Sequence, residues 1–195
     1  MSSFILASQS PRRKSLLEWA ELDFEIIVSA SDESFPASMS ISDVPEYIAK
    51  NKALAVELKI KNEQPTMLNH CIITADTVVV LDNTIMGKPM DRADAIASLT
   101  KLSGRTHQVI TGVCILYKEQ LETFAETTQV EFHELTMDQI VYYVDHYKPY
   151  DKAGGYAIQE WIGVIGIKKI QGDFYNVMGL PVSKLLQKIK QLNLL

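Results

Sequence analysis

The residues from Cys71 to Leu81 form the stretch that most resembles a buried β-strand, and they set the first constraint on the fold. Every residue in this run is apolar or threonine except Asp76. The pair Asp82-Asn83 that follows is a turn signal, so Thr84 to Met86 is expected to return as a second strand. Such a strand needs a core around it. A chain of 195 residues can bury one, as one large domain or two intimate lobes.

Helical and strand-like patterns fill the rest of the chain. Strands are predicted from Phe4, at 24–28, 106–117 and 121–132, with a further β-rich stretch at 162–170. Helices are predicted at 12–21, 44–58, 92–102, 137–146 and 181–192, and loops at 29–41, 148–159 and 172–176. The two long strands suggest an antiparallel hairpin that turns near Lys118-Glu119-Gln120. This mixture predicts an α/β or α+β fold with a single core over residues 1–195.

The composition is that of an ordinary soluble globular protein, with 47% hydrophobic and 22% charged residues. A net charge of −5 argues against general binding to nucleic acid or to a membrane surface, so any anion site must be a local basic pocket. No apolar run reaches the length of a membrane span, and the first residues lack the pattern of a secretory signal. Cys71 and Cys114 lie in apolar runs without CxxC spacing, which predicts buried reduced thiols in a cytoplasmic protein.

Residues 4–13 predict a strand, a tight loop and a helix start that carries two arginines. Ser10 is expected to cap the helix and Pro11 to take its first position, where a missing N–H costs nothing. Arg12 and Arg13 then stand in the first turn, where cations oppose the helix dipole. A bound anion would explain this placement, because free N–H groups and guanidinium groups both attract anions. The alternative is a solvated arginine pair on a surface helix.

Asp76 is the sharpest single signal, because it interrupts an otherwise apolar strand. An unpaired buried carboxylate costs several kcal/mol, so Asp76 must be paired, bound to a metal or exposed in a cleft. The alternative is an aspartate at a strand bend that accepts hydrogen bonds from nearby backbone N–H groups. Glu33, in the long loop, could join Asp76 in holding a divalent cation, which prefers oxygen ligands and phosphate oxygens.

Basic residues are spread over loops and element ends, as on any solvated surface, but a suitable fold could gather them around a polyphosphate. They are Arg12, Arg13, Lys52, Lys88 and Arg105. Gly154-Gly155 could mark a close backbone approach to a ligand or a plain turn. The sequence has no GxxxxGK[ST], GxGxxG or GxSxG motif, which disfavours the usual nucleotide-binding folds and serine hydrolases.

Eight segments, taken together and in order, resemble the Maf family of nucleotide pyrophosphatases and cover nearly the whole chain. They are residues 8–13 (SQSPRR), 32–33 (DE), 52–53 (KA), 74–78 (TADTV), 87–89 (GKP), 103–107 (SGRTH), 151–159 (DKAGGYAIQ) and 176–181 (NVMGLP). The resemblance implies a mixed sheet with flanking helices, like that of inosine triphosphate pyrophosphatases, in two lobes around a cleft. It also implies hydrolysis of a nucleoside triphosphate to the monophosphate and pyrophosphate with Mg or Mn, and a possible homodimer.

The resemblance carries roles to individual residues. Asp76 matches the family's proton acceptor, and whether it acts as a base or as a metal ligand stays open. The positions expected around the phosphates and the metal are Ser8, Arg13, Glu33, Lys52 and Lys88. Within that set, Glu33 would share the metal with Asp76. The positions associated with base choice are Arg12, Thr77 and Gln159.

The base-choice residues are similar to those of the branch that acts on dTTP and UTP. The branch that prefers 7-methyl-GTP carries Trp and Gln at the first two positions. Glu160 follows Gln159 here, where family members often have Gly. Three functions are therefore considered: a dTTP and UTP pyrophosphatase, a pyrophosphatase for 7-methyl-GTP or other non-canonical nucleotides, and a non-catalytic nucleotide-binding regulator of cell division.

Overall fold

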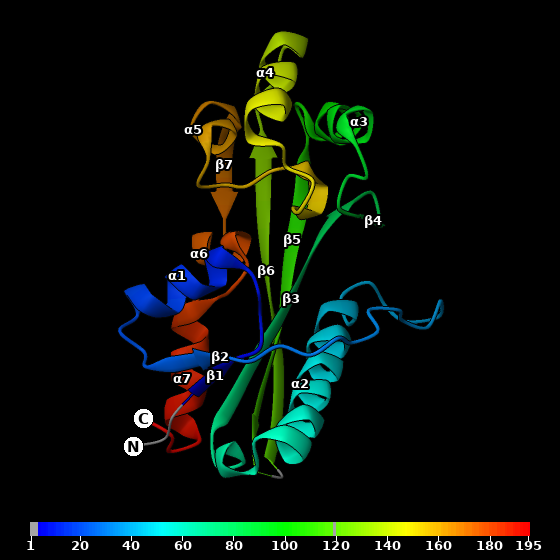
Figure 1. Ribbon diagram of the computed structural model, residues 1–195. Coiled ribbons are helices and arrows are strands. Elements are labelled where there is room, and N and C mark those ends of the chain that lie inside the picture. The colour runs from blue at the N-terminus through cyan, green and yellow to red at the C-terminus, as the bar shows by residue number, and fades with distance from the viewer. Residues whose placement is uncertain (1–3, 119) are drawn as a thin grey trace. The chain divides into compact units, whose positions relative to one another are not determined.

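The computed structural model describes residues 4–118 and 120–195 as a mixed α/β structure (Figure 1). The strands are β1 (Phe4–Leu6), β2 (Phe24–Ile26), β3 (Cys71–Leu81), β4 (Thr84–Met86), β5 (Thr106–Tyr117), β6 (Gln120–Phe132) and β7 (Ile167–Gln171). The helices are α1 (Pro11–Trp19), α2 (Val44–Glu63), α3 (Arg92–Leu102), α4 (Met137–Tyr147), α5 (Trp161–Gly166), α6 (Phe174–Met178) and α7 (Val182–Gln191). Two short 3-10 helices are η1 (Pro65–Met67) and η2 (Ala153–Gly155). The predicted fold class is confirmed.

The strands form one mixed sheet in the order β2-β1-β3-β5-β6-β7, with β4 paired to β3. The chain divides into two compact units. The first unit comprises Met1–Asp76, Thr111–Glu126 and Gly179–Leu195, and the second comprises Thr77–Ile110 and Thr127–Met178. The division falls inside β3, β5 and β6, so Asp76 and Thr77 are neighbours in one strand but belong to different units.

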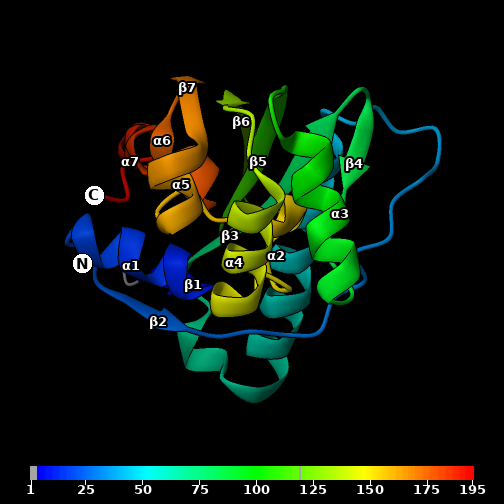
Figure 2. The ribbon, with the colours of Figure 1, turned by 90° about the horizontal axis from the view of Figure 1, so that it is seen from above.

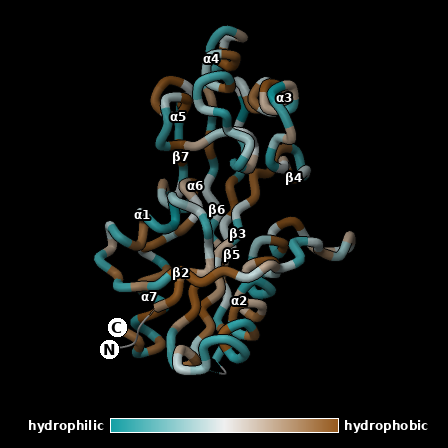
Figure 3. Tube along the Cα trace, in the orientation of Figure 1, coloured by the Kyte–Doolittle hydropathy of each residue, from teal (hydrophilic) through white to brown (hydrophobic). Residues whose placement is uncertain are grey.

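The first unit is built on parallel pairing of β1 with both β2 and β3, in which Phe4 is opposite Phe24 and Cys71. Helix α2 covers one face of these strands. Its residues Ala49, Ala53, Val56 and Ile60 share a buried cluster with strand residues Ile5, Ile72 and Cys114. Helices α1 and α7 lie on the other side of β1 and β3 from α2 (Figures 1 and 2). Hydrophobic colour follows β1 and β3 in Figure 3, so the strands form the centre of this unit.

The second unit pairs β3 with β4 and β6 with β7, both antiparallel. Asp82 and Asn83 take left-handed backbone angles, with φ of 48° and 57°, in the tight turn between β3 and β4. This is the turn that the Asp-Asn pair predicted. Helices α3 and α4 pack against each other in this unit (Figure 2).

Two short segments differ from the sequence prediction. Residues 162–166, predicted as β-rich from their isoleucines and valine, form helix α5, and β7 begins only at Ile167. Residues 174–176, predicted as loop, lie in helix α6. The helix at α5 brings Gly163 so close to the Ile158 carbonyl that an added Cβ would lie 1.8 Å from its oxygen. Close backbone packing of this kind overrides β-propensity, which depends strongly on context. The predicted turn at Lys118-Glu119-Gln120 includes Glu119, which lies outside the described residues.

Both cysteines are free and buried, as predicted. Burial raises the pKa of Cys71 and of Cys114 to about 12, because a thiolate is poorly solvated inside the protein. Neither thiol is therefore ionised near neutral pH. Across residues 4–118 and 120–195, none of the helices has the length and apolar character needed to cross a membrane.

Candidate functional site

The helix start predicted around Ser10 is present in the first unit. Ser10 is the N-cap of α1, and Pro11 occupies its first position. The Ser10 hydroxyl accepts a hydrogen bond from the Arg13 backbone N–H at 3.5 Å. The Ser8 hydroxyl accepts one from the Ser10 backbone N–H at 3.2 Å. These short-range bonds fix the loop between β1 and α1 and leave both arginines half-buried in the first turn.

The guanidinium group of Arg13 donates two hydrogen bonds within the first unit. Its Nε donates to the Gly179 carbonyl at 2.8 Å, and its Nη1 donates to the Ser8 hydroxyl at 3.3 Å. Burial lowers the pKa of Arg13, and the neighbouring Arg12 lowers it further, whereas the carboxylates of Asp76 and Glu33 raise it. The arginine pair is thus part of a charged cluster with two carboxylates rather than a solvated surface pair.

Lys52 of α2 bridges the two predicted acidic residues. Its Nζ donates to Asp76 Oδ1 at 2.7 Å and lies 2.8 Å from Glu33 Oε1. The side chains of Lys52 and Asp76 are only 18% and 15% exposed, whereas that of Glu33 is 54% exposed. Of the three outcomes predicted for Asp76, the structure therefore shows a paired carboxylate at the edge of solvent.

The register of β3 against α2 explains why Lys52 meets Asp76. The Thr74 hydroxyl donates to the Ala49 carbonyl at 2.6 Å, which joins the strand to the helix. Thr74 and Asp76 are two residues apart and therefore lie on the same face of the strand. Ala49 and Lys52 are three residues apart and lie on the same face of the helix. The buried hydrogen bond between Thr74 and Ala49 thus places Asp76 of the strand opposite Lys52 of the helix.

The loop before α2 presents Glu33. The Asp32 carboxylate accepts hydrogen bonds from the Ser34 N–H at 2.8 Å and the Ser34 hydroxyl at 2.7 Å. These bonds lower the pKa of Asp32, because they favour its charged form. Lys59 of α2 donates to the Val28 carbonyl at 3.0 Å, at the start of the same loop. Bonds on both sides of Glu33 therefore hold this part of the loop.

The donor set of the first unit fits a Mg or Mn ion that is completed by substrate. Glu33 and Asp76 both direct a carboxylate oxygen at the same ammonium group. Within the described ranges, no group of three or more His, Cys, Asp or Glu side chains is placed to hold a metal. Mg²⁺ in nucleotide enzymes is commonly held by one or two carboxylates plus phosphate oxygens and water. Two carboxylates are therefore sufficient protein ligands.

The predicted site residues fall into two sets. Those of the first unit are Ser8, Arg12, Arg13, Glu33, Lys52 and Asp76, and those of the second are Thr77, Lys88 and Gln159. The contacts above join Arg13 to Ser8, and Lys52 to Asp76 and Glu33. The charges of Asp76, Glu33 and Arg12 act on Arg13 and shift its pKa. In the second unit, Lys88 and Gln159 are exposed, and Thr77 is half-buried.

Two further candidates make contacts within the second unit. Arg105 lies in the second unit, where its Nη2 donates to both carboxylate oxygens of Asp82 at 2.7 and 2.6 Å. Gly154 has a left-handed φ of 68°, and an added Cβ would lie 3.0 Å from the Val79 side chain. Its close approach is to the protein's own strand, so the plain structural explanation accounts for this glycine.

A contact that the sequence did not predict is the one from Arg13 to Gly179. The two residues are 166 positions apart. Gly179 adopts a φ of 118°, in the left-handed half of the map that favours glycine. The NVMGLP segment is one of those that carry the resemblance, which gives it no role. The glycine before Leu-Pro was the available signal.

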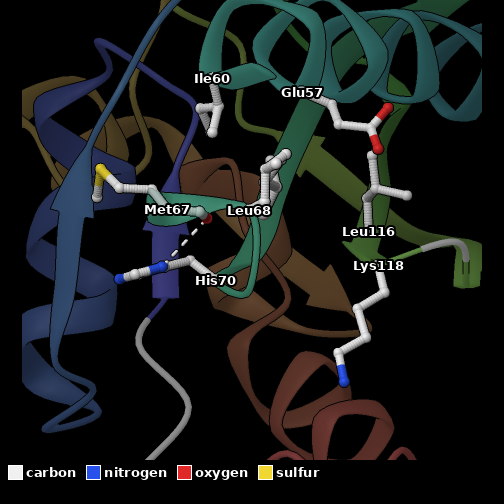
Figure 4. A pocket seen from close by; sticks show the side chains of 8 residues that line it. Glu57, Ile60, Met67, Leu68, His70, Leu116 and Lys118 are labelled. Atoms are coloured by element: carbon white, nitrogen blue, oxygen red, sulfur yellow. Dashed lines mark hydrogen bonds between the residues drawn. The ribbon is translucent and has the colours of Figure 1, made fainter. Parts of the chain in front are cut away.

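A small hollow lies elsewhere in the first unit, at the hairpin end of β5 (Figure 4). It is lined by Glu57, Ile60, Met67, Leu68, His70, Ile72, Leu116 and Lys118. His70 Nδ1 lies 3.1 Å from the Met67 carbonyl oxygen, and Glu57 pairs with Lys61 one helical turn away. None of the predicted site residues lines this hollow, so it is separate from the charged cluster.

Comparison with known proteins agrees with the motif pattern. The family described as Maf-like protein matches residues 3–192. A protein of Parabacteroides distasonis named dTTP/UTP pyrophosphatase is 50% identical over 95% of this chain and 94% of its own. Proteins of the same name from Bacteroides fragilis and Porphyromonas gingivalis are 46% and 48% identical, over 96% and 95% of this chain and 95% and 92% of theirs. The chain therefore belongs to the Maf family.

Proposed function

We propose that this protein is a nucleoside triphosphate pyrophosphatase that hydrolyses dTTP and UTP to the monophosphate and pyrophosphate. The observation that carries the proposal is the charged cluster. In it Lys52 pairs with both Asp76 and Glu33, and the negative charges of these two carboxylates raise the pKa of Arg13. The choice of dTTP and UTP is supported by the name that the relatives share.

The cluster has the parts that phosphoryl transfer requires. This chemistry depends on positioning and on neutralising charge more than on covalent help from the protein. Arg13 is pre-oriented by Ser8 and by the Gly179 carbonyl, so its guanidinium group is held in a defined position, which lowers the entropic cost of binding an anion. Lys52 supplies a second cation at the same place. We assign these two side chains to binding the triphosphate, with the Ser8 hydroxyl beside them.

Asp76 is assigned to the attacking water. As a carboxylate it can accept a proton from, or orient, a water molecule that attacks the α-phosphorus, and the leaving group is then pyrophosphate. A divalent cation, when bound by Glu33 and Asp76, would supply charge neutralisation and make the attacking water more acidic.

The remaining site residues keep the roles predicted from the resemblance. Lys88 is proposed to bind phosphate, and Arg12, Thr77 and Gln159 to select the base. A glutamine amide offers one acceptor and two donors, which suits the carbonyl and N–H edge of uracil or thymine. Cytoplasmic location is proposed because both cysteines are free thiols. A homodimer is likewise proposed and can be tested by light scattering.

The test is a panel of nucleotides assayed for pyrophosphate release with Mg or Mn. The panel contains dTTP, UTP, dCTP, dATP, dGTP, ITP and 7-methyl-GTP. We expect kcat/KM to be highest for dTTP and UTP, with one pyrophosphate formed per monophosphate. Preference for 7-methyl-GTP or ITP would favour the second function considered above. Tight binding of nucleotides without turnover would favour the non-catalytic regulator.

A further inference from the structure

Gln159 is the exposed residue of an otherwise buried turn in the second unit. The Glu160 N–H donates to the Ala157 carbonyl at 3.1 Å, which closes a four-residue turn. Ala157 and Ile158 are 5% and 4% exposed, whereas Gln159 is exposed. The turn thus presents one polar side chain to solvent from a packed backbone.

A single buried hydroxyl group forms hydrogen bonds to both ends of this turn. Tyr143 of α4 is fully buried, and its hydroxyl accepts a hydrogen bond from the Ala157 backbone N–H at 3.1 Å. The same hydroxyl donates to Glu160 Oε2. One oxygen atom therefore bonds to the residue two before Gln159 and to the residue directly after it.

A buried lysine holds the other oxygen of Glu160. The Lys152 side chain is 9% exposed, and its Nζ lies 3.5 Å from Glu160 Oε1 and 2.7 Å from Asp151 Oδ1. A buried ammonium group is strongly destabilising unless it is paired. The pair therefore gives Glu160 a fixed position, and Glu160 is the residue that stands where a glycine was expected from the resemblance.

The backbone around Gln159 is also packed from its C-terminal side. The Glu160 carbonyl accepts from the Gly163 N–H at 2.9 Å, and Gly163 lies against the Ile158 carbonyl with no room for a Cβ. Every neighbour of Gln159 in the turn is thus held by hydrogen bonds, an ion pair or close packing.

We propose that Tyr143 and Glu160, supported by Lys152, are positioning residues that fix the Gln159 turn and thereby set selectivity among pyrimidine bases. The inference rests on the proposed function, in which Gln159 reads the base. A glutamine amide that can rotate matches the hydrogen-bonding edge of cytosine as well as that of uracil or thymine. Selectivity therefore depends on presenting the amide from one fixed backbone position, so that the wrong base leaves polar groups unpaired.

The test compares two single-atom changes on neighbouring residues of α4. Tyr143→Phe removes the hydroxyl that joins Ala157 to Glu160. Tyr142→Phe removes the hydroxyl of a residue whose ring is 44% exposed and stacks on His146. We expect Tyr143→Phe to lower the ratio of kcat/KM for dTTP to that for dCTP by about 5–10-fold, and Tyr142→Phe to leave this ratio unchanged.

A second pair of variants covers the case in which Tyr143→Phe does not fold. Glu160→Gln keeps an oxygen that can accept from Tyr143, whereas Glu160→Ala removes both contacts. We expect Glu160→Ala to lose selectivity and Glu160→Gln to regain part of it. A purely structural role would instead lower kcat for dTTP and dCTP by the same factor, through a smaller fraction of active enzyme.

A double-mutant cycle completes the experiment. In a Gln159→Ala background we expect Tyr143→Phe to have no further effect on the dTTP to dCTP ratio. An unchanged ratio in the single variants, or an equal effect with and without Gln159, would overturn the positioning role while leaving pyrophosphatase activity intact. A wild-type enzyme that releases no pyrophosphate from dTTP or UTP would overturn the proposed function, and this inference with it.

Discussion

The Lys52 ammonium group lies 2.7 Å from the Asp76 carboxylate and 2.8 Å from the Glu33 carboxylate. One cation thus pairs with two carboxylates, one from a strand and one from a loop. A bound triphosphate would bring more negative charge to this cluster, and a divalent cation would bring positive charge. In the proposed function, the two carboxylates would be shared by lysine and metal, and the phosphates would bind to these cations.

The first prediction concerns Lys52. We expect Lys52→Met to lower kcat/KM for dTTP by about 10²–10³-fold, because a cation that faces developing charge is lost. The unfolding free energy should fall by about 1–3 kcal/mol, because Asp76 is left without its nearest partner. The matched control is Lys50→Met, since Lys50 is an exposed lysine of the same helix. Initial rates and urea unfolding check both expectations, and equal rates in the two variants would remove Lys52 from the site.

The second prediction concerns the shape of the Arg13 side chain. Arg13→Lys keeps the positive charge. A lysine lacks the planar guanidinium group whose Nε and Nη1 donate to the Gly179 carbonyl and the Ser8 hydroxyl. We expect kcat/KM for dTTP to fall by about 10–100-fold through misplacement of the cation. The exposed neighbour Lys14, which pairs only weakly with Glu18 at 3.5 Å, gives the control Lys14→Arg. The measurement is kcat/KM for dTTP at several salt concentrations. Near-wild-type values for both Arg13→Lys and Lys14→Arg would show that only the charge of Arg13 matters.

The third prediction is a pH dependence of stability in the second unit. His107 is buried beside Phe132 and Tyr156, and burial lowers its pKa to about 4 from the usual 6.5. Between these values the unfolded chain binds a proton at this side chain that the folded protein does not. Stability should therefore rise with pH from about 4 to about 6.5, by about 3 kcal/mol from this residue.

The measurement is urea unfolding at a series of pH values for the wild type and for His107→Gln. The difference in slope between the two proteins isolates the histidine from the carboxylates, which titrate in the same range. The same slope in both proteins would show that His107 is protonated in the folded state.

The fourth prediction concerns the packing of β5 against α2. An added Cβ at Gly112 would lie 2.2 Å from the Glu46 backbone nitrogen and 2.2 Å from the Pro45 carbonyl carbon. We expect Gly112→Ala to lower the unfolding free energy by about 2–4 kcal/mol, because backbone must move. Gly87→Ala is the control, since nothing lies within 4 Å of its added Cβ. Thermal unfolding of the two variants distinguishes them, and similar melting temperatures would mean that the strand and helix are less tightly packed.

Local signals were sufficient for most helix boundaries. Asp91 accepts from the Asp94 N–H at the start of α3, and Thr136 forms a capping box with Gln139 at the start of α4. Such caps depend on residues within one turn, so the sequence shows them directly. The turn at Asp82 was equally visible, because few residues tolerate its backbone angles.

Helix α5 is the clearest case in which β-propensity gives the wrong element. Ile162 and Val164 have strong β-propensity, yet they lie in α5, where Gly163 packs on the Ile158 carbonyl. The two residues of this contact are close in the sequence, but the apolar pattern does not show how tightly their backbones approach. Long strands such as β3 and β5 were predictable because their apolar pattern extends over many residues.

In the site, too, some residues could be predicted from the sequence, whereas their contacts could not. Asp76 stood out because a carboxylate in an apolar strand requires a partner, but the sequence did not name that partner. The sequence offers Glu33 as a second ligand beside Asp76 and Lys52 as one of several scattered basic residues, but it does not show that Lys52 pairs with both carboxylates. The contact from Arg13 to Gly179 joins opposite ends of the chain. Pairings across such distances follow from the register of β3 against α2, which the Thr74 hydroxyl fixes.

The most direct test of the account is pyrophosphate release from dTTP by the wild type and by Asp76→Asn at saturating Mg or Mn. Asparagine keeps the size of the side chain and can still accept from Lys52, but it carries no charge and cannot take up a proton. The control is Asp82→Asn, which removes an exposed carboxylate from a pair with Arg105. We predict a loss of at least about 10³-fold for Asp76→Asn with the fold intact, and none for Asp82→Asn. A variant at Asp76 that keeps more than about a tenth of the wild-type rate would contradict the account.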